Sequence, residues 1–409
     1  MKSIRVSLGT AILLGLVRGR NDVDPTTAYL LTEGGCARAC AFCAQARAAV
    51  SGCTGNEGDE NDIRGKDMLS RVVWPSFPLD EVAGAIARNV LGVRANPGAG
   101  PGSSGLSRKE TNDRCAAGDA HGVEPGIRRI CFQVTSRPGV LDDVKGAILA
   151  LREAFRREAG AIGGQGCCAT GRTPAVPISV SYHPGNLNEI EELFALGVER
   201  IGIALDAANE RIFHDIKGGS FAQTLDLLER AARNFPGKVS THIIVGLGET
   251  EEEALRLIQR LHDSGITVGL FAFTPVKGTP LESRRPPDIG SYRRIQAGRY
   301  LIVNSISRVE SFAFSDEGAG SRVTGFGIIP SELVRLLASG DAFRTSGCVE
   351  CNRPYYNERP GGTIYNYPRP LTMDEVRQAV EKMGLPDLRK EVGVPSLARG
   401  GRILVPKWG

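Results

Sequence analysis

The sequence predicts an α/β protein built on a (βα) barrel of the TIM-barrel type, with up to eight strands, an N-terminal helix and an irregular C-terminal extension. Short β-type runs alternate with helical patterns of roughly 10–15 residues, which is typical of βαβ units and a parallel sheet. The chain has 409 residues, of which 41% are hydrophobic and 23% charged, as in ordinary globular proteins. One barrel of about 250 residues therefore leaves room for an additional part.

The pattern divides the chain into three parts. Residues 1–24 are expected to form an N-terminal helical segment. Residues 25–327 are expected to form the barrel, with insertions rich in Gly, Ser and Asn near 51–66 and 96–125. Residues 328–409 are expected to form the extension, which carries a C-x-x-C motif and one helix.

The elements expected in the barrel follow one another in a regular order. The strands, which are apolar or alternating, are expected at 27–32, 129–135, 178–182, 200–205, 239–245, 267–273 and 308–313. The helices between them are expected at 141–157, 187–196, 221–234, 251–264 and 291–305. After Gly327 the alternation stops, and a segment dense in Tyr, Pro and Gly precedes a helix at 373–383. At least six βα units therefore fit one barrel, and the extension is expected to cover part of it.

Composition excludes several classes of protein. Fifty Lys and Arg against 46 Asp and Glu give a net charge of +4, and no basic run is interleaved with aromatic residues, so no nucleic-acid partner is predicted. The longest apolar stretch, from Ala11 to Val17, is too short to cross a membrane, and no signal-peptide cleavage site follows it. Ten cysteines, several of them in short-spaced groups, indicate metal chemistry and a reducing, cytoplasmic compartment.

Three cysteines directly after the first expected barrel strand form the clearest motif. Cys36, Cys40 and Cys43 stand as C-x-x-x-C-x-x-C, which lets one loop bind three irons of a 4Fe–4S cube and leaves the fourth iron open. In a (βα) barrel this loop lies at the end where chemistry takes place. The alternative is a zinc knuckle or chance spacing, but no fourth Cys or His lies between Ala44 and Gly52.

With this triplet the sequence resembles the radical S-adenosylmethionine superfamily, whose cysteine loop has the same spacing and an aromatic residue, here Phe42, before the last cysteine. IIVGLGETEEE at 243–253 and FTPVKGTPLE at 273–282 are similar to strand signatures of its biotin-synthase-like branch. The resemblance implies a 4Fe–4S cluster whose open iron binds S-adenosylmethionine, and electron transfer that cleaves this cofactor to a 5′-deoxyadenosyl radical.

The resemblance also implies residues that hold the cofactor. Asp206 follows the fourth strand, where the branch carries an aspartate that binds the ribose hydroxyls; a helix N-cap is the alternative. Ile244 and Gly246 would contact adenine, although a core Ile and a turn Gly explain them equally well. The residues expected near the methionine group are Gln133, Thr135 and Ser136. His183 could line the substrate pocket or be an ordinary loop histidine.

The remaining cysteines suggest a second, auxiliary 4Fe–4S cluster. Cys131 alternates with apolar residues and by pattern alone is a small buried hydrophobe, but biotin synthase places a cluster ligand on this strand. Where that enzyme has further cysteine ligands, this chain has Ser179 or Ser181 and Ser240. Cys348 and Cys351, in the extension, would complete a three-thiolate site with Cys131. The alternatives are a structural zinc and unligated surface cysteines, and the sequence assigns no role to Cys53, Cys115, Cys167 and Cys168.

The extension sequence GCVECNRPYYNERPGGTIYNYPRPL resembles a motif of the two-component lipoyl synthases. The resemblance implies sulfur insertion into an octanoyl chain on a lysine of a lipoyl carrier protein or domain, together with a homologous radical S-adenosylmethionine subunit. It also implies an electron donor such as ferredoxin or flavodoxin. The alternatives are a biotin-synthase-like enzyme that acts on a free small molecule without sulfur donation, and a non-catalytic iron–sulfur partner subunit.

Overall fold

The fold is known from a computed structural model that describes residues 1–46, 68–92, 126–161, 176–315, 321–356, 358, 361–386 and 388. Its main feature is an eight-stranded sheet with the order β10-β9-β8-β7-β6-β2-β1-β5. The six parallel strands of this sheet are β2 (Thr27–Leu31), β6 (Arg129–Gln133), β7 (Ile178–Ser181), β8 (Arg200–Gly202), β9 (Val239–Val245) and β10 (Thr267–Ala272). All six were predicted as strands.

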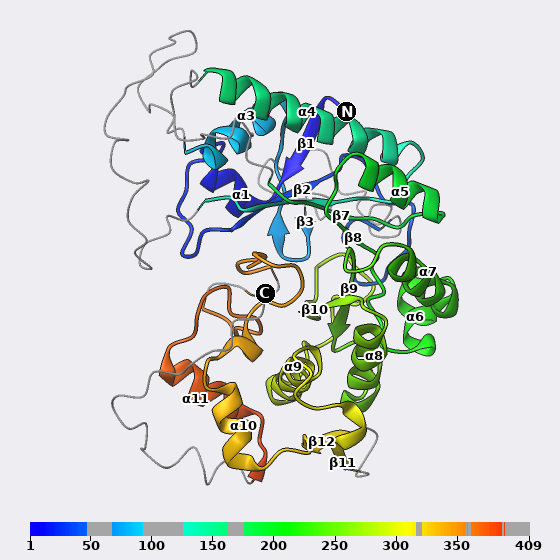
Figure 1. The fold of residues 1–409 in the computed structure, drawn as a ribbon, viewed down its shortest axis with the longest axis vertical. Coiled ribbons are helices and arrows are strands. Elements are labelled where there is room, and N and C mark those ends of the chain that lie inside the picture. Colours follow the sequence, from blue (N-terminus) through cyan, green and yellow to red (C-terminus); the bar gives the residue numbers. More distant parts are fainter. Residues whose placement is uncertain are drawn as a thin grey trace.

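Helices connect the parallel strands and lie on the outer side of the curved sheet (Figure 1). The connecting helices are α3 (Leu79–Val90), α4 (Val140–Ala161), α5 (Leu187–Ala195), α6 (Glu210–Lys217), α7 (Phe221–Asn234) and α8 (Glu251–Asp263), and α9 (Ile289–Val303) follows the last parallel strand, β10. The start of α8 shows the local cause of a helix boundary, because Thr250 and Glu253 form a capping box there. The repeated strand–helix order gives the mostly parallel α/β fold that the sequence predicts.

The N-terminal segment differs from the prediction of a helical segment. It forms strand β1 (Ser3–Val6) before a short helix α1 (Leu8–Leu13). β1 pairs antiparallel with β2 and with β5 (Ser76–Pro78) and so extends the main sheet. Within the described residues no ladder joins β5 to β10, so the sheet is an open barrel with two edges.

The seventh predicted strand, at 308–313, is also different in the structure. A 3-10 turn η2 (Val309–Ser311) occupies most of it, and β11 (Ala313–Ser315) pairs with β12 (Arg322–Gly325) in a separate two-stranded sheet. A second small ladder is formed by β3 (Met68–Leu69) and β4 (Val72–Val73). The predicted insertions near 51–66 and 96–125 lie outside the described residues.

The C-terminal extension folds back onto the barrel. It contains α10 (Pro330–Leu337), a 3-10 turn η3 (Asp341–Phe343) and α11 (Met373–Lys382), the last close to its predicted position. Buried arginines of α9 hold it: Arg293 donates to the carbonyls of Ile364 and Tyr365, each at 2.6 Å. The segment that follows η3, orange in Figure 1, lies against the inner side of the open sheet.

One large apolar core joins the sheet, the helices and the extension. A smaller cluster of Tyr29, Leu31 and Trp74 lies beside β2, with Cys131, Cys351 and Tyr356 packed against it. In the described part of the chain, no helix is long and apolar enough to span a membrane.

Candidate functional site

The cysteine triplet lies in the loop that follows β2, and backbone hydrogen bonds fix this loop to its neighbours. The amide of Ala37 donates to the carbonyl of Ser136 at 2.7 Å, and that of Ala41 donates to the carbonyl of Ile216 at 2.7 Å. The loop also closes on itself, because the amide of Cys36 donates to the carbonyl of Gln45 at 3.1 Å. The fold thus ties the triplet to the carboxyl ends of the strands, where barrel enzymes carry their chemistry.

Cys36, Cys40 and Cys43 all line one cavity of about 190 Å3 at this end of the sheet. Burial raises the pKa of Cys40 to about 11 and that of Cys43 to about 12. These two thiols are therefore protonated near neutral pH, and a bound iron would have to displace their protons.

The same cavity brings together most residues that were predicted to hold a cofactor. Phe42, Gln133, Thr135, Ser136, Asp206 and Ile244 line it, and so does His183. Gly246 is not among the lining residues. It has a φ of +106°, and its backbone N–H donates a hydrogen bond to the Glu249 carboxylate at 2.6 Å. Both features fit the alternative of a turn glycine.

Asp206 is a buried anion in the cavity wall and does not cap α6, because Asn209 occupies the N-cap position. Its carboxylate lies 2.7 Å from Lys217 Nζ and 2.6 Å from His242 Nε2. Burial opposes ionisation of Asp206, but Lys217 and His242 outweigh it and hold the pKa of the carboxyl well below its ordinary value. Sequence reasoning missed both partners, since Lys217 ends a helix and His242 lies inside β9.

The polar residues that follow β6 are hydrogen-bonded within the protein. Thr135 Oγ1 is 2.9 Å from Thr32 Oγ1, and the side-chain amide of Gln133 donates to Cys131 Sγ at 3.1 Å. The carbonyl of Ser136 accepts the bond that fixes the triplet loop. Gln133 therefore lines the first cavity and also donates a hydrogen bond to Cys131, which belongs to a second group of cysteines.

Cys131, Cys348 and Cys351 lie together in a second cavity of about 80 Å3, although they come from distant parts of the chain. Ser179, Ser181 and Ser240, the residues at the expected cysteine positions, also line it. Ser179 accepts a bond from Arg129 at 2.6 Å. Burial raises the pKa of Cys131 and of Cys348, and neighbouring thiols add to this shift.

The segment with Cys348 and Cys351 is bound at the amino ends of β2 and β6. The side chain of Asn352 accepts the amide of Thr26 at 3.0 Å and donates to the carbonyl of Asp24 at 2.9 Å. Arg129 donates to the carbonyl of Val349 at 3.0 Å. These bonds place the C-x-x-C motif across the bottom of the barrel.

The same segment runs along the edge strand β10. Ser346 Oγ accepts the amide of Leu270 at 2.8 Å. A Cβ added to Gly269 would lie 3.3 Å from the carbonyl oxygen of Ser346, so the absence of a side chain there permits the close approach. The extension therefore lies against the open edge of the sheet.

The two cavities adjoin one another. Gln133, Ser181, His242, Phe271 and Tyr356 line both of them. Tyr356, which sequence reasoning missed, packs edge-on against Phe271 with ring centroids 5.5 Å apart. A molecule bound between the cavities would therefore contact these five shared residues.

Among the described residues, no three His, Cys, Asp or Glu side chains are grouped so that they could hold one metal ion.

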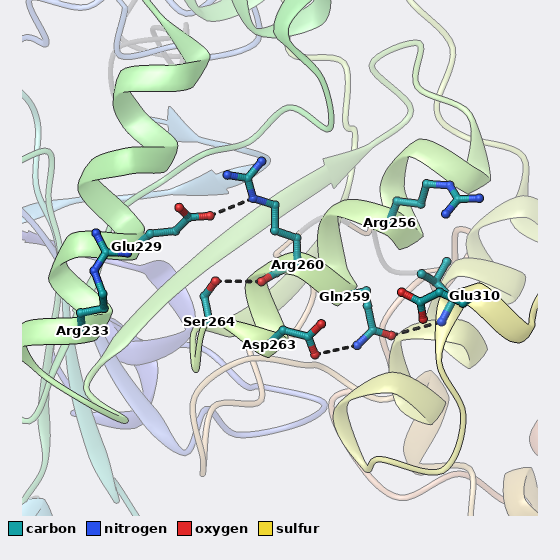
Figure 2. A pocket seen from close by; sticks show the side chains of 9 residues that line it. Glu229, Arg233, Arg256, Gln259, Arg260, Asp263, Ser264 and Glu310 are labelled. Atoms are coloured by element: carbon teal, nitrogen blue, oxygen red, sulfur yellow. Dashed lines mark hydrogen bonds and ion pairs between the residues drawn. The ribbon is translucent and has the colours of Figure 1, made fainter.

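A third cavity, of about 440 Å3, lies on the outer face of α7 and α8 (Figure 2). Two of its charged groups, Arg260 and Glu229, pair at 2.8 Å, and Asp263 is 2.8 Å from Arg308, which lies outside the lining. It contains no cysteine or histidine.

Comparisons with known proteins cover part of the chain. Residues 104–268 match the radical SAM superfamily model, SAM being S-adenosylmethionine. An uncharacterised protein of Methanocaldococcus jannaschii is 28% identical over 200 residues, which cover 48% of each chain. The mitochondrial biotin synthase of Arabidopsis thaliana is 27% identical over 184 residues, which cover 40% of this chain and 48% of that one. The chain thus aligns with about half the length of these curated relatives.

Among solved structures, the FeFe-hydrogenase maturase HydG from Carboxydothermus hydrogenoformans superposes with a TM-score of 0.42 at 14% identity, covering 68% of this chain and 52% of that one. The family match and the similarity to biotin synthase support the radical SAM superfamily, whose domains bind a 4Fe–4S cluster and S-adenosylmethionine.

Proposed function

We propose that the protein is a radical SAM sulfur-insertion enzyme, a lipoyl synthase subunit that thiolates an octanoyl chain bound to a lysine of a carrier protein. The observation that carries the proposal is the meeting of Cys131, Cys348 and Cys351 in a cavity that adjoins the cavity of the triplet. An enzyme that only abstracts hydrogen needs one cluster. A second cluster held by thiols next to the first would place its sulfide near a carbon radical.

Cys36, Cys40 and Cys43 would hold the first cluster, and Cys131, Cys348 and Cys351 the second. When bound, the first cluster with S-adenosylmethionine supplies the 5′-deoxyadenosyl radical, and the second supplies sulfide as a consumed substrate. The chain itself provides position: Asp206 offers a carboxylate to the cofactor ribose, and Phe42 and Ile244 offer apolar surface to its adenine.

The cavity wall suits an alkyl substrate. Its apolar members come from five strands or the loops after them, and they include Leu31, Phe42, Leu69, Val134, Ile244, Phe271 and Phe273. An octanoyl chain offers no charge to recognise, so its position has to come from contact with such groups and from docking of its carrier. A homologous subunit and an electron donor such as ferredoxin or flavodoxin complete the proposed system.

The deciding experiment incubates an octanoyl-lysine peptide with reconstituted protein, reductant and S-adenosylmethionine, with and without a homologous subunit, and detects thiolated peptide by mass spectrometry. We expect about eight irons per chain, because two cubes carry four each. Four irons and no thiolated peptide would favour an enzyme acting on a free small molecule without sulfur donation. No cleavage of S-adenosylmethionine would favour a non-catalytic partner subunit.

Two sets of variants separate the two cysteine groups. Cys36→Ala, Cys40→Ala or Cys43→Ala should each abolish reductive cleavage of S-adenosylmethionine, because the first cluster loses one of three protein ligands. Replacing Cys131, Cys348 and Cys351 together by Ala should preserve cleavage and 5′-deoxyadenosine formation but remove the thiolated product. Thiolated product from the triple variant would contradict the proposed sulfur source.

A further inference from the structure

Two polar side chains reach the cysteines of the second cavity from neighbouring strands. Tyr29 on β2 is paired in register with Cys131 on β6. The hydroxyl of Tyr29 is 3.3 Å from Cys351 Sγ, and the side-chain amide of Gln133 is 3.1 Å from Cys131 Sγ. Tyr29 is only 5% exposed, so its hydroxyl is held away from bulk water.

The direction of the bond between Tyr29 and Cys351 follows from the other partner of the hydroxyl. The amide N–H of Arg353 donates to the Tyr29 oxygen at 2.8 Å, so this oxygen acts as an acceptor there and keeps its one proton for a second bond. A cysteine that ligates iron is a thiolate and has no proton to give. In the loaded protein, Tyr29 is therefore the donor and Cys351 the acceptor.

Gln133 has the same relation to Cys131. Its side-chain NH2 group can donate, whereas its carbonyl oxygen would face a thiolate with like charge, so the amide orientation in the structure is the favourable one. Two of the three sulfurs thus receive a hydrogen bond from a residue that the strand ladder holds in place.

We propose that Tyr29 and Gln133 are positioning residues that donate hydrogen bonds to the thiolates of Cys351 and Cys131 and thereby raise the reduction potential of the second cluster. The inference rests on the proposed function, because it requires a cluster in the second cavity. Its physical reason is that a donor to a ligating sulfur stabilises the more electron-rich, reduced state. Easier reduction suits a cluster that has to accept an electron when a carbon radical bonds to its sulfide.

The test is a redox titration, followed by electron paramagnetic resonance, of the full chain carrying Cys36→Ala, Cys40→Ala and Cys43→Ala so that only the second cluster contributes. In this background Tyr29→Phe and Gln133→Leu should each shift the midpoint potential to a more negative value, and the double variant should shift it further. Tyr365→Phe is the matched control, because its hydroxyl donates to the carbonyl of Pro287 at 2.8 Å and it lines neither cavity. The control potential should stay unchanged.

The outcomes separate this inference from the proposed function. If the protein that carries only Cys36→Ala, Cys40→Ala and Cys43→Ala binds no cluster, the proposed function itself is overturned. A cluster of normal iron content with an unchanged potential in both variants would overturn only the role of the donors. If Tyr29→Phe retains no iron, Gln133→Leu decides alone, and an unchanged potential in that variant overturns the inference.

Discussion

Asp206 shows what one residue contributes to the first cavity. Its backbone has a left-handed φ of +67°, a conformation that Asp and Asn adopt more readily than other non-glycine residues. Its amide donates to the carbonyl of His242 at 3.0 Å, and its carbonyl accepts the amide of Ile244 at 2.7 Å. These two bonds fix the carboxylate at the cavity wall with Lys217 behind it.

Asp206→Asn should weaken binding of S-adenosylmethionine by roughly tenfold or more without loss of iron. The variant keeps a side chain that tolerates the backbone conformation but removes a charge-assisted acceptor, which is typically worth about 1.5–3 kcal/mol. Isothermal titration of the reconstituted protein measures the affinity, and iron analysis checks the cluster.

The same substitution leaves Lys217 without its carboxylate, and its side chain is only 1% exposed. Breaking such a pair typically costs about 3–5 kcal/mol of stability. The double variant Asp206→Asn, Lys217→Met is therefore the control: it should regain stability but not affinity. Recovery of affinity in the double variant would contradict a direct contact of Asp206 with the cofactor.

Tyr356 is the second residue for which the structure makes a clear prediction. It lines both cavities, and its ring packs edge-on against Phe271. Tyr356→Ala should raise the ratio of 5′-deoxyadenosine to thiolated product, because the substrate loses the ring that holds it between the two sites. Tyr356→Phe keeps the ring and should retain the wild-type ratio. Equal ratios in all three proteins would contradict a positioning role.

At the scale of elements, the sequence was most informative where the contacts are local. The six parallel strands were predicted within a few residues, because their alternating or continuous apolar patterns are read directly. The strand β1 was taken for part of a helical segment, since its four residues become a strand only through pairing with β2 and β5. The strand prediction at 308–313 was wrong. This run has a strand-like pattern, but it forms a 3-10 turn and the start of β11 outside the main sheet.

In the candidate site too, residues that are close in sequence could be predicted and residues brought together by the fold could not. The triplet could be predicted because three cysteines lie within eight residues. Lys217, His242 and Tyr356 could not, because only the fold brings a helix end to Asp206 and brings a strand and the extension to the cavity wall. The contact of Tyr29 with Cys351 could not be predicted either, because the two residues are far apart in the sequence.

The contact between α9 and the extension gives a prediction at this scale. Arg293 is 2% exposed, binds two carbonyls of the extension and stacks between the rings of Phe343 and Tyr367. Arg293→Met should cost about 2–4 kcal/mol, because the carbonyls of Ile364 and Tyr365 lose a charged donor. It should also lower the iron content of the second cluster while the first is retained.

Iron analysis and the two clusters' resonance signals measure this effect, and urea denaturation measures the stability. Arg335→Met is the matched control, because Arg335 is 70% exposed and pairs with Glu332 on its own helix. Equal loss from both clusters in Arg293→Met would indicate general unfolding instead of release of the extension.

At the scale of the whole molecule, the second cavity is assembled by a segment whose backbone is unusual. Glu350, Arg353 and Tyr355 have positive φ values of 63°, 37° and 55°, and Gly347 has 117°. Each such non-glycine residue typically costs about 1–3 kcal/mol and persists only where surrounding contacts require it. A cluster bound by Cys348 and Cys351 would add such contacts.

Removal of iron by a chelator should therefore loosen this segment more than the barrel. Because a ligand that binds only the folded form stabilises it, the loaded protein should also unfold at a higher temperature than the iron-free protein. Hydrogen exchange of peptides from 346–356 measures the local effect, with peptides of α7 as the internal reference. Equal exchange of 346–356 in both forms would contradict a coupling between the cluster and this segment.

The C-x-x-C loop is attached to the amino ends of β2 and β6, whereas the triplet lies at the carboxyl ends. Val349, between its two cysteines, is 71% exposed. If the cysteines of this loop hold the proposed sulfur source, that source would be spent in each catalytic cycle and would have to be rebuilt before the next. The exposed loop would let this repair take place from the end of the barrel opposite to the triplet.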